Sequence, residues 1–139
     1  MPADDLDAEL KIFLRVHATS YEQLEILLYL RSAQRDWSAE ELARELRLNG
    51  SATESALETL QEKNLIVARA PTGEGVLQFA YQAQGKPADQ VLERIAHELQ
   101  ERPATLLRVL SAHALERLRT RAAYAFADAF VLRKDKSDG

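Results

Sequence analysis

The chain has 139 residues and a mass of 15.6 kDa, a length that allows one domain with extensions and excludes a large multidomain enzyme. Apolar residues make up 46% and charged residues 29% of the sequence, as in folded globular chains and unlike disordered or membrane chains. The formal net charge is -4, from 18 Lys and Arg against 22 Asp and Glu. That balance differs from what nonspecific binding to nucleic acid or an anionic membrane requires.

Cysteine is absent, which excludes disulfides, thiol nucleophiles and cysteine-based zinc sites. The acidic N-terminus lacks the basic segment and apolar run of a secretory signal. The longest apolar run, Ile26 to Leu30, is too short to span a bilayer. We therefore expect a cytoplasmic protein without a membrane partner.

Three helix starts are predicted by a Ser that is followed three positions later by Glu or Gln, at Ser20, Ser38 and Ser51. In this capping box the Ser hydroxyl accepts a backbone N–H of the first turn while the Glu or Gln side chain reaches back. The apolar spacing that follows predicts helices over residues 21–34, 39–46 and 52–63. Only residues 47–50 separate the second helix from the third, so a tight turn joins them.

After the third helix the apolar period changes from helical to alternating. Residues 65–70 are β-prone, residues 71–75 have turn chemistry, and residues 76–82 place Leu77, Phe79 and Tyr81 on one face. This pattern predicts a β-hairpin. A very short third strand is predicted at Asp36 and Trp37, and we interpret the Trp37 side chain as a core anchor.

Beyond Pro87 the sequence is helical again. It predicts helices over residues 88–101 and about 104–132, with a break at Arg102 and Pro103 and a second interruption near residues 111–113. The last helix carries apolar residues at heptad spacing with aromatic residues beside them. Either this helix packs back on its own domain or it pairs with a second copy in a homodimer. The residues that would form the dimer are Leu115, Leu118, Ala122, Ala125, Phe126, Ala129 and Phe130.

The predicted fold is mainly α with a small β-hairpin wing. We divide the chain into an N-terminal helical extension (1–19), a winged helix-turn-helix domain (20–84) and a C-terminal helical region (85–139). Residues 37–66 resemble the helix-turn-helix and first wing strand of bacterial winged-helix regulators of the MarR and ArsR kind. The resemblance rests on structural positions: Leu42, Ala43 and Leu46 in the first helix, Leu48 in the turn, Leu57 and Leu60 in the second, and Leu65 and Ile66 entering the wing.

The resemblance implies a cytoplasmic, bacterial, dimeric transcription regulator that presents the helix starting near residue 50 to DNA. In relatives that read DNA, the N-terminal half of this helix enters the major groove. The positions that would contact DNA are Arg47, Asn49, Gly50, Ser51, Ala52, Thr53, Ser55, Thr59 and Arg69.

The charge of the predicted reading helix favours a different partner. Glu54, Glu58 and Glu62 recur every four residues and form one acidic stripe, which a phosphate backbone would repel. Residues 1–70 hold 8 basic and 13 acidic residues, whereas residues 71–139 hold 10 and 9. The alternative function is therefore a protein-interaction module whose acidic third helix docks on a basic partner and does not bind DNA.

Catalytic and metal-binding patterns are not found in the sequence. His17, His97 and His113 lack metal-ligand spacing, and phosphate-binding glycine loops are absent. We expect neither an enzyme nor a cofactor. A ligand-responsive regulator with a pocket between the winged domain and the C-terminal helices stays open, although no residue specifies a ligand. Basic residues gather late in the chain, and we interpret them mainly as helix-dipole compensation and a solvated tail: Arg108, Arg117, Arg119, Arg121, Arg133, Lys134 and Lys136.

Overall fold

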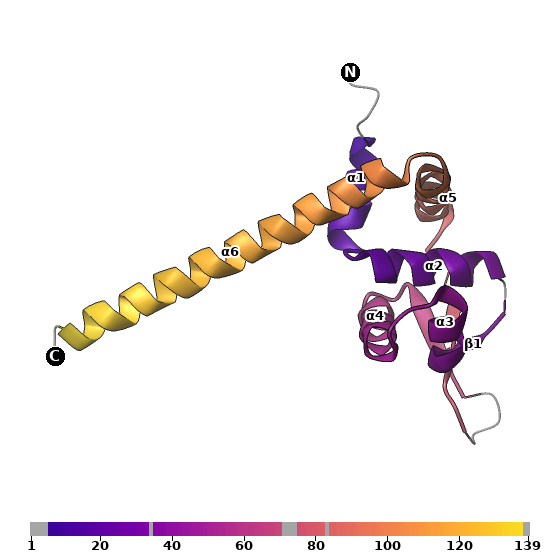
Figure 1. Ribbon diagram of the computed structural model, residues 1–139, viewed down its shortest axis with the longest axis horizontal. Helices are drawn as coiled ribbons and strands as arrows, with labels where there is room; N and C mark the ends of the chain where they lie inside the picture. The colour runs from indigo at the N-terminus through magenta and orange to yellow at the C-terminus, as the bar shows by residue number, and fades with distance from the viewer. Residues whose placement is uncertain (1–5, 34, 71–74, 83, 138–139) are drawn as a thin grey trace.

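The computed structural model describes residues 6–33, 35–70, 75–82 and 84–137, and side chains up to residue 129 within them. The elements are the following: α1 (Ala8–Val16), α2 (Tyr21–Ala33), β1 (Trp37–Ser38), α3 (Ala39–Leu46), α4 (Gly50–Glu62), β2 (Ile66–Arg69), β3 (Gln78–Tyr81), α5 (Lys86–Glu101) and α6 (Pro103–Ser137). Figure 1 shows α2 crossing above α3 and α4, with the hairpin beneath them and α6 extending away from the rest. The fold is a winged helix-turn-helix with additional helices at both ends of the chain, as predicted.

The predicted capping box forms completely at α3, whereas at α2 only one of its two hydrogen bonds forms. At α3 the Ser38 hydroxyl accepts the Glu41 N–H at 3.1 Å, and the Glu41 carboxylate accepts the Ser38 N–H at 3.0 Å. Before α2 the Ser20 hydroxyl accepts the Gln23 N–H, but the Gln23 side chain accepts the N–H of Thr19 instead of that of Ser20.

The predicted start of the third helix is wrong by two residues. α4 begins at Gly50, and its N-cap is Asn49, whose Oδ1 accepts the N–H groups of Ser51 and Ala52 at 2.8 and 3.3 Å. Ser51 therefore lies in the first turn instead of capping it. An Asn in extended backbone geometry is among the best N-caps, so Asn49 outcompetes the Ser two positions later.

The wing is a three-stranded antiparallel sheet in the order β1-β3-β2. Trp37 pairs with Phe79, and Val67 pairs with Ala80. Phe79 is buried, whereas Leu77 precedes β3 and is half exposed, so the predicted apolar face is buried for only part of its length. The predicted turn at residues 71–75 lies outside the described residues except for Gly75.

Trp37 packs at the margin of the core instead of inside it. Its ring is partly buried against the core and meets Tyr29 edge-on, with ring centroids 5.0 Å apart. The Arg35 guanidinium covers the Trp37 ring at 3.6 Å, a cation–π contact.

One core runs through the helices of the winged part and of both ends of the chain. α1 contributes Leu10, Phe13 and Leu14, which pack towards α5 and α6, and α2 contributes four buried apolar residues. Leu92 and Ile95 of α5 and Leu106 and Leu110 of α6 complete it. The N-terminal helix is thus packed against the C-terminal helices, which fixes the base of α6.

α6 is continuous from Pro103 to Ser137, so the interruption predicted near residues 111–113 does not form. The break at Arg102 and Pro103 is confirmed, since α5 ends at Glu101. Past its base, α6 extends away from the other elements, and no other helix of the described residues lies beside it (Figure 1). Leu115, Leu118 and Phe126 are 48%, 60% and 74% exposed. The base of α6 therefore packs on its own domain through Leu106 and Leu110, whereas the heptad stretch beyond it is exposed in the single chain.

Candidate nucleic-acid interface

The N-terminal end of α4 is the exposed end of the helix-turn-helix. α4 buries Thr53, Ala56, Leu57 and Leu60 on one face against α2 and α3. Because these residues hold the helix by one side, its other side and its first turn face outward. The first turn carries no acidic side chain, and its N–H groups form the positive end of the helix dipole. That end can approach a phosphate group.

Most of the predicted DNA-contact residues lie on this outward surface. Arg47 is exposed, and its backbone adopts a left-handed conformation (φ 57°) that ends α3 and turns the chain towards α4. Exposed residues at the start of α4 supply amide, hydroxyl and backbone groups, and two further predicted residues are partly exposed. The first set is Asn49, Gly50, Ser51 and Ser55, and the second is Ala52 and Thr59.

Thr53 does not belong to this surface, which corrects the sequence-based list. Its side chain is fully buried, and its hydroxyl donates to the Asn49 carbonyl at 2.9 Å. The residue therefore stabilises the first turn of α4 from inside. The Thr59 hydroxyl is also occupied, because it donates to the Ser55 carbonyl at 3.1 Å.

The predicted acidic stripe follows the first turn on the same helix. Glu54, Glu58 and Glu62 are all exposed. Lys63, which directly follows α4, interacts electrostatically with Glu62. Arg44 is paired with Glu40 at 3.2 Å, and Arg69 of the wing lies 3.5 Å from Asp36. The interface thus combines a neutral first turn, preceded by Arg47, with an acidic flank.

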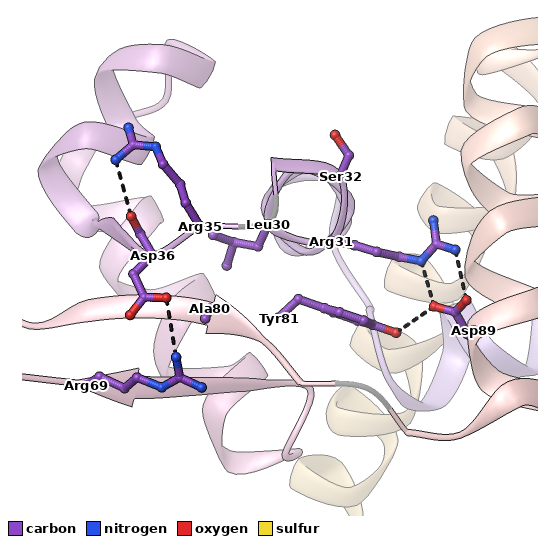
Figure 2. A pocket seen from close by; sticks show the side chains of 9 residues that line it. All are labelled: Leu30, Arg31, Ser32, Arg35, Asp36, Arg69, Ala80, Tyr81 and Asp89. Carbon is purple, nitrogen blue, oxygen red and sulfur yellow. Dashed lines mark hydrogen bonds and ion pairs between the residues drawn. The ribbon is translucent and has the colours of Figure 1, made fainter.

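A cleft of about 550 Å³ lies between α2, the hairpin and the start of α5. Figure 2 shows a separate ion pair at each end of it. At one end Asp36 accepts from Arg69, while the guanidinium of Arg35 donates to the Asp36 carbonyl at 3.4 Å. At the other end Arg31 of α2 meets Asp89 of α5.

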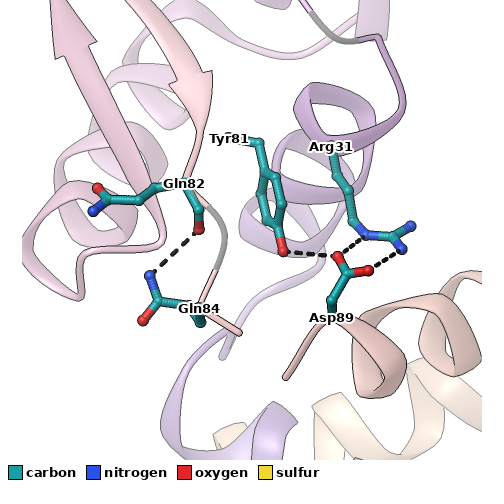
Figure 3. Close-up of polar contacts among 5 residues, drawn as sticks. All are labelled: Arg31, Tyr81, Gln82, Gln84 and Asp89. Atoms are coloured by element: carbon teal, nitrogen blue, oxygen red, sulfur yellow. Dashed lines mark hydrogen bonds and ion pairs between the residues drawn. The ribbon is translucent and has the colours of Figure 1, made fainter. Parts of the chain in front are cut away.

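The Arg31–Asp89 pair joins the winged part to α5 (Figure 3). Arg31 donates two hydrogen bonds to the Asp89 carboxylate, at 2.8 and 3.0 Å, and the Tyr81 hydroxyl of β3 donates a third at 3.1 Å. The Arg31 hydrogen bond lowers the pKa of Asp89, with a smaller contribution in the same direction from Tyr81. Burial, and then the hydrogen bond to Asp89, raise the pKa of Tyr81. Three elements are thereby tied at one carboxylate.

Sequence reasoning did not find this cluster. Arg31 and Asp89 are 58 positions apart, and no spacing or motif relates them. Gln84 donates through its side chain to the Asn64 carbonyl and, at 3.3 Å, to the Gln82 carbonyl, the latter drawn in Figure 3.

Among the described residues, no group of three or more His, Asp or Glu side chains is arranged to hold a metal ion. The described helices also include none that is both long and apolar enough to cross a membrane.

The fold defined by these elements is that of winged-helix proteins, and solved structures share it. The chain is similar to the adhesin competence repressor AdcR from Streptococcus pyogenes, with 19% identity over 84% of this chain and 82% of that chain and a TM-score of 0.51. It is also similar to a mutant of MepR from a multidrug-resistant S. aureus clinical isolate, with 20% identity over 86% of each chain and a TM-score of 0.53. These likenesses confirm the winged-helix fold that the sequence predicts. No protein-family model matches the chain, and a search of curated proteins found no match.

Proposed function

We propose that this protein is a winged-helix DNA-binding transcriptional regulator that acts as a homodimer. The observation that carries the proposal is the exposed first turn of α4, which is capped by Asn49, has no acidic side chain and has Arg47 beside it. In winged helix-turn-helix proteins this turn is the part that meets base edges in the major groove. The fold shared with AdcR, whose name describes a repressor, supports the same function.

Within this function, the direct contacts are assigned to the exposed members of the predicted set. Asn49, Ser51 and Ser55 offer side chains that hydrogen-bond to bases or phosphates, and Arg47 and Arg69 offer positive charge to the backbone. Gly50 allows close approach of the main chain. Ala52 and Thr59 lie at the margin of the surface, and Thr53 is excluded because it is buried.

Dimerisation is assigned to the part of α6 that lies beyond the base of the helix. Leu115, Leu118 and Phe126 are large apolar side chains with between 48% and 74% of their surface exposed. Ala122, Ala125 and Ala129 are exposed between and beyond them and would let a second helix approach closely. The side chain of Phe130, also predicted at this interface, lies outside the described side chains. Full burial of such a side chain contributes about 1.5–3 kcal/mol, and these side chains, already partly covered, would contribute about half to three quarters of that. The heptad spacing of this apolar face suits a second copy of the same helix, which is the partner proposed for it.

The experiment that tests the proposal is fluorescence anisotropy with mixed-sequence duplex DNA at low salt, where electrostatic attraction is strongest. We expect binding that weakens as salt is added. Arg47→Gln should weaken binding. It should also make the plot of log affinity against log salt concentration less steep, by about 0.9 in slope for each phosphate that the variant no longer neutralises. Arg108→Gln, an exposed change on α6, is the matched control and should leave affinity unchanged. Absence of binding by the wild-type protein at low salt would refute the proposal.

The exposed acidic stripe favours one alternative, a protein-interaction module that docks on a basic partner through Glu54, Glu58 and Glu62. The double variant Glu54→Lys, Glu58→Lys separates the two functions. A DNA-binding protein should gain affinity for duplex DNA, because repulsion is replaced by attraction. If the protein is instead an interaction module, the wild type should not bind DNA, and the double variant should no longer bind the basic partner. Glu101→Lys is the control, since that residue lies where α5 leads into α6, away from α4 (Figure 1).

A further inference from the structure

A second cavity, of about 430 Å³, lies between the end of α1 and the middle of α6, and none of the α6 residues that line it is among those assigned to DNA contact or to dimerisation. Arg15 of α1 and Arg117 and Arg121 of α6 contribute three guanidinium groups to its wall. His113 and Glu116 line it as well. The cavity is thus strongly basic, with one carboxylate against three arginines.

The single carboxylate does not neutralise this wall. Glu116 accepts from Arg15 at 2.9 Å, so its charge is already engaged by one of the three arginines. Arg117 donates through Nη2 to the Thr19 carbonyl at 3.3 Å, which is a neutral acceptor. Its Nη1 atom and the Nδ1 atom of His113 are buried and have no hydrogen-bond partner within the described part of the chain. Buried polar groups are rarely left unpaired, since each costs about 1–3 kcal/mol.

Two titratable groups near the cavity, His113 and Lys63, have pKa values lowered first by burial and then by neighbouring arginines. Burial, and next the charge of Arg15, lower the pKa of His113, and Arg117 acts in the same direction while Glu116 opposes them. On the other side of Arg117, Lys63 donates to the Val16 carbonyl at 2.7 Å. Burial and then Arg117 lower the pKa of Lys63.

We propose that this cavity binds a small oxyanion, a carboxylate or phosphate group, held by the guanidinium of Arg117 with Arg121 and the His113 imidazole beside it. A guanidinium is planar and presents several N–H donors in a fixed arrangement that suits the oxygens of both groups. An anion here offsets the charge of the three arginines. The site requires neither DNA nor the α4 surface, so it extends beyond the proposed function.

The test uses the intact chain and two probes, inorganic phosphate and acetate, at constant pH and ionic strength. Amide chemical shifts are followed by ¹H–¹⁵N NMR while each probe is added. We expect saturable shifts centred on Arg15, His113 and Arg117. Saturation by both probes supports a general oxyanion site, and saturation by phosphate alone supports a phosphate site. Shifts that do not saturate, or that spread over the surface without a centre, would overturn the proposal.

Two variants on α6 make the test specific. Arg117→Gln should weaken binding by about tenfold or more, the loss expected for a charge-assisted hydrogen bond. Arg119→Gln removes the same charge two positions away, from an exposed residue outside the cavity, and should bind as the wild type does. If circular dichroism shows that Arg117→Gln does not fold, Arg121→Gln replaces it with the same expectation. Equal binding by the cavity variant and the Arg119→Gln control would also overturn the proposal.

Discussion

The carboxylate of Asp89 ties α5 to the winged part, and its removal should destabilise the protein by a measurable amount. Asp89→Asn keeps the shape of the side chain but removes the charge that accepts two hydrogen bonds from Arg31. A charge-assisted hydrogen bond contributes about 1.5–3 kcal/mol when it is well shielded, and an exposed ion pair about 0–1 kcal/mol. The Arg31 and Asp89 side chains are 22% and 41% exposed, so the pair falls between these limits. We expect a loss of about 1–2 kcal/mol in the free energy of unfolding.

The pH dependence of this loss follows from the lowered pKa of Asp89. A carboxyl group whose pKa is lower in the folded protein stabilises the fold above its unfolded pKa of about 4. That contribution disappears as the pH falls through the folded pKa. The difference between wild type and Asp89→Asn should therefore be constant from about pH 7 to pH 5 and shrink below about pH 4.

Urea denaturation measured at pH 7, 5, 4 and 3 tests this expectation. The protein concentration is held fixed, because association of a second copy also stabilises the fold. Glu101→Gln is the control, since this carboxylate on the same helix is exposed and lies at the far end of α5 from Asp89, so it should not reproduce the loss. The reasoning is refuted if Asp89→Asn is as stable as the wild type at pH 7, or if the difference persists unchanged at pH 3.

Three further predictions concern the cap, the α6 face and the core. Asn49→Ala should lower the free energy of unfolding by about 1 kcal/mol, because the α4 cap is lost, whereas Ser51→Ala should change it little. Thermal denaturation of the two variants compares these losses, and equal losses would contradict the assignment of Asn49 as the cap. Leu118→Glu should convert a dimer to a monomer in sedimentation velocity, and an unchanged sedimentation coefficient at high concentration would count against the proposed interface. Leu27→Ala, at a fully buried position, should cost about 2–5 kcal/mol in urea denaturation, and a cost below about 1 kcal/mol would contradict the core.

The order of elements could be predicted because it depends on local signals. Ser38 and Glu41 are three positions apart and form the capping box that their spacing predicts. The heptad spacing of α6 predicts one apolar face, but spacing alone does not say what covers it. The interruption near residues 111–113 was predicted wrongly because that stretch holds neither Pro nor Gly, so nothing prevents the helix from continuing.

Errors at the candidate interface also have local causes. Thr53 lies three positions before Ala56 and four before Leu57, so helical spacing already places it on the buried face. The hydroxyl of Thr53 suits a DNA contact by its chemistry, but its position on the buried face of α4 keeps it from one. The start of α4 was misplaced because Asn49 and Ser51 both suit an N-cap, and only the backbone geometry decides between them.

Other features depend on contacts between distant parts of the chain. The Arg31–Asp89 pair joins residues 58 positions apart, and the Arg15–Glu116 pair in the cavity between α1 and α6 joins residues 101 positions apart. No sequence periodicity relates such residues, and the late basic residues look like an ordinary solvated helix until Arg117 is seen to lie against Thr19. Their identification required the folded arrangement.

Selection of bound sequences from a random duplex DNA library at low salt tests the central claim of a dimeric DNA-binding regulator most directly. We expect enrichment of a sequence with two related half-sites whose centres are about 10–10.5 base pairs apart, or a multiple of that spacing, because a dimer presents its two α4 helices to successive major grooves. Enrichment of no sequence over repeated rounds, with the protein folded throughout, would contradict the claim.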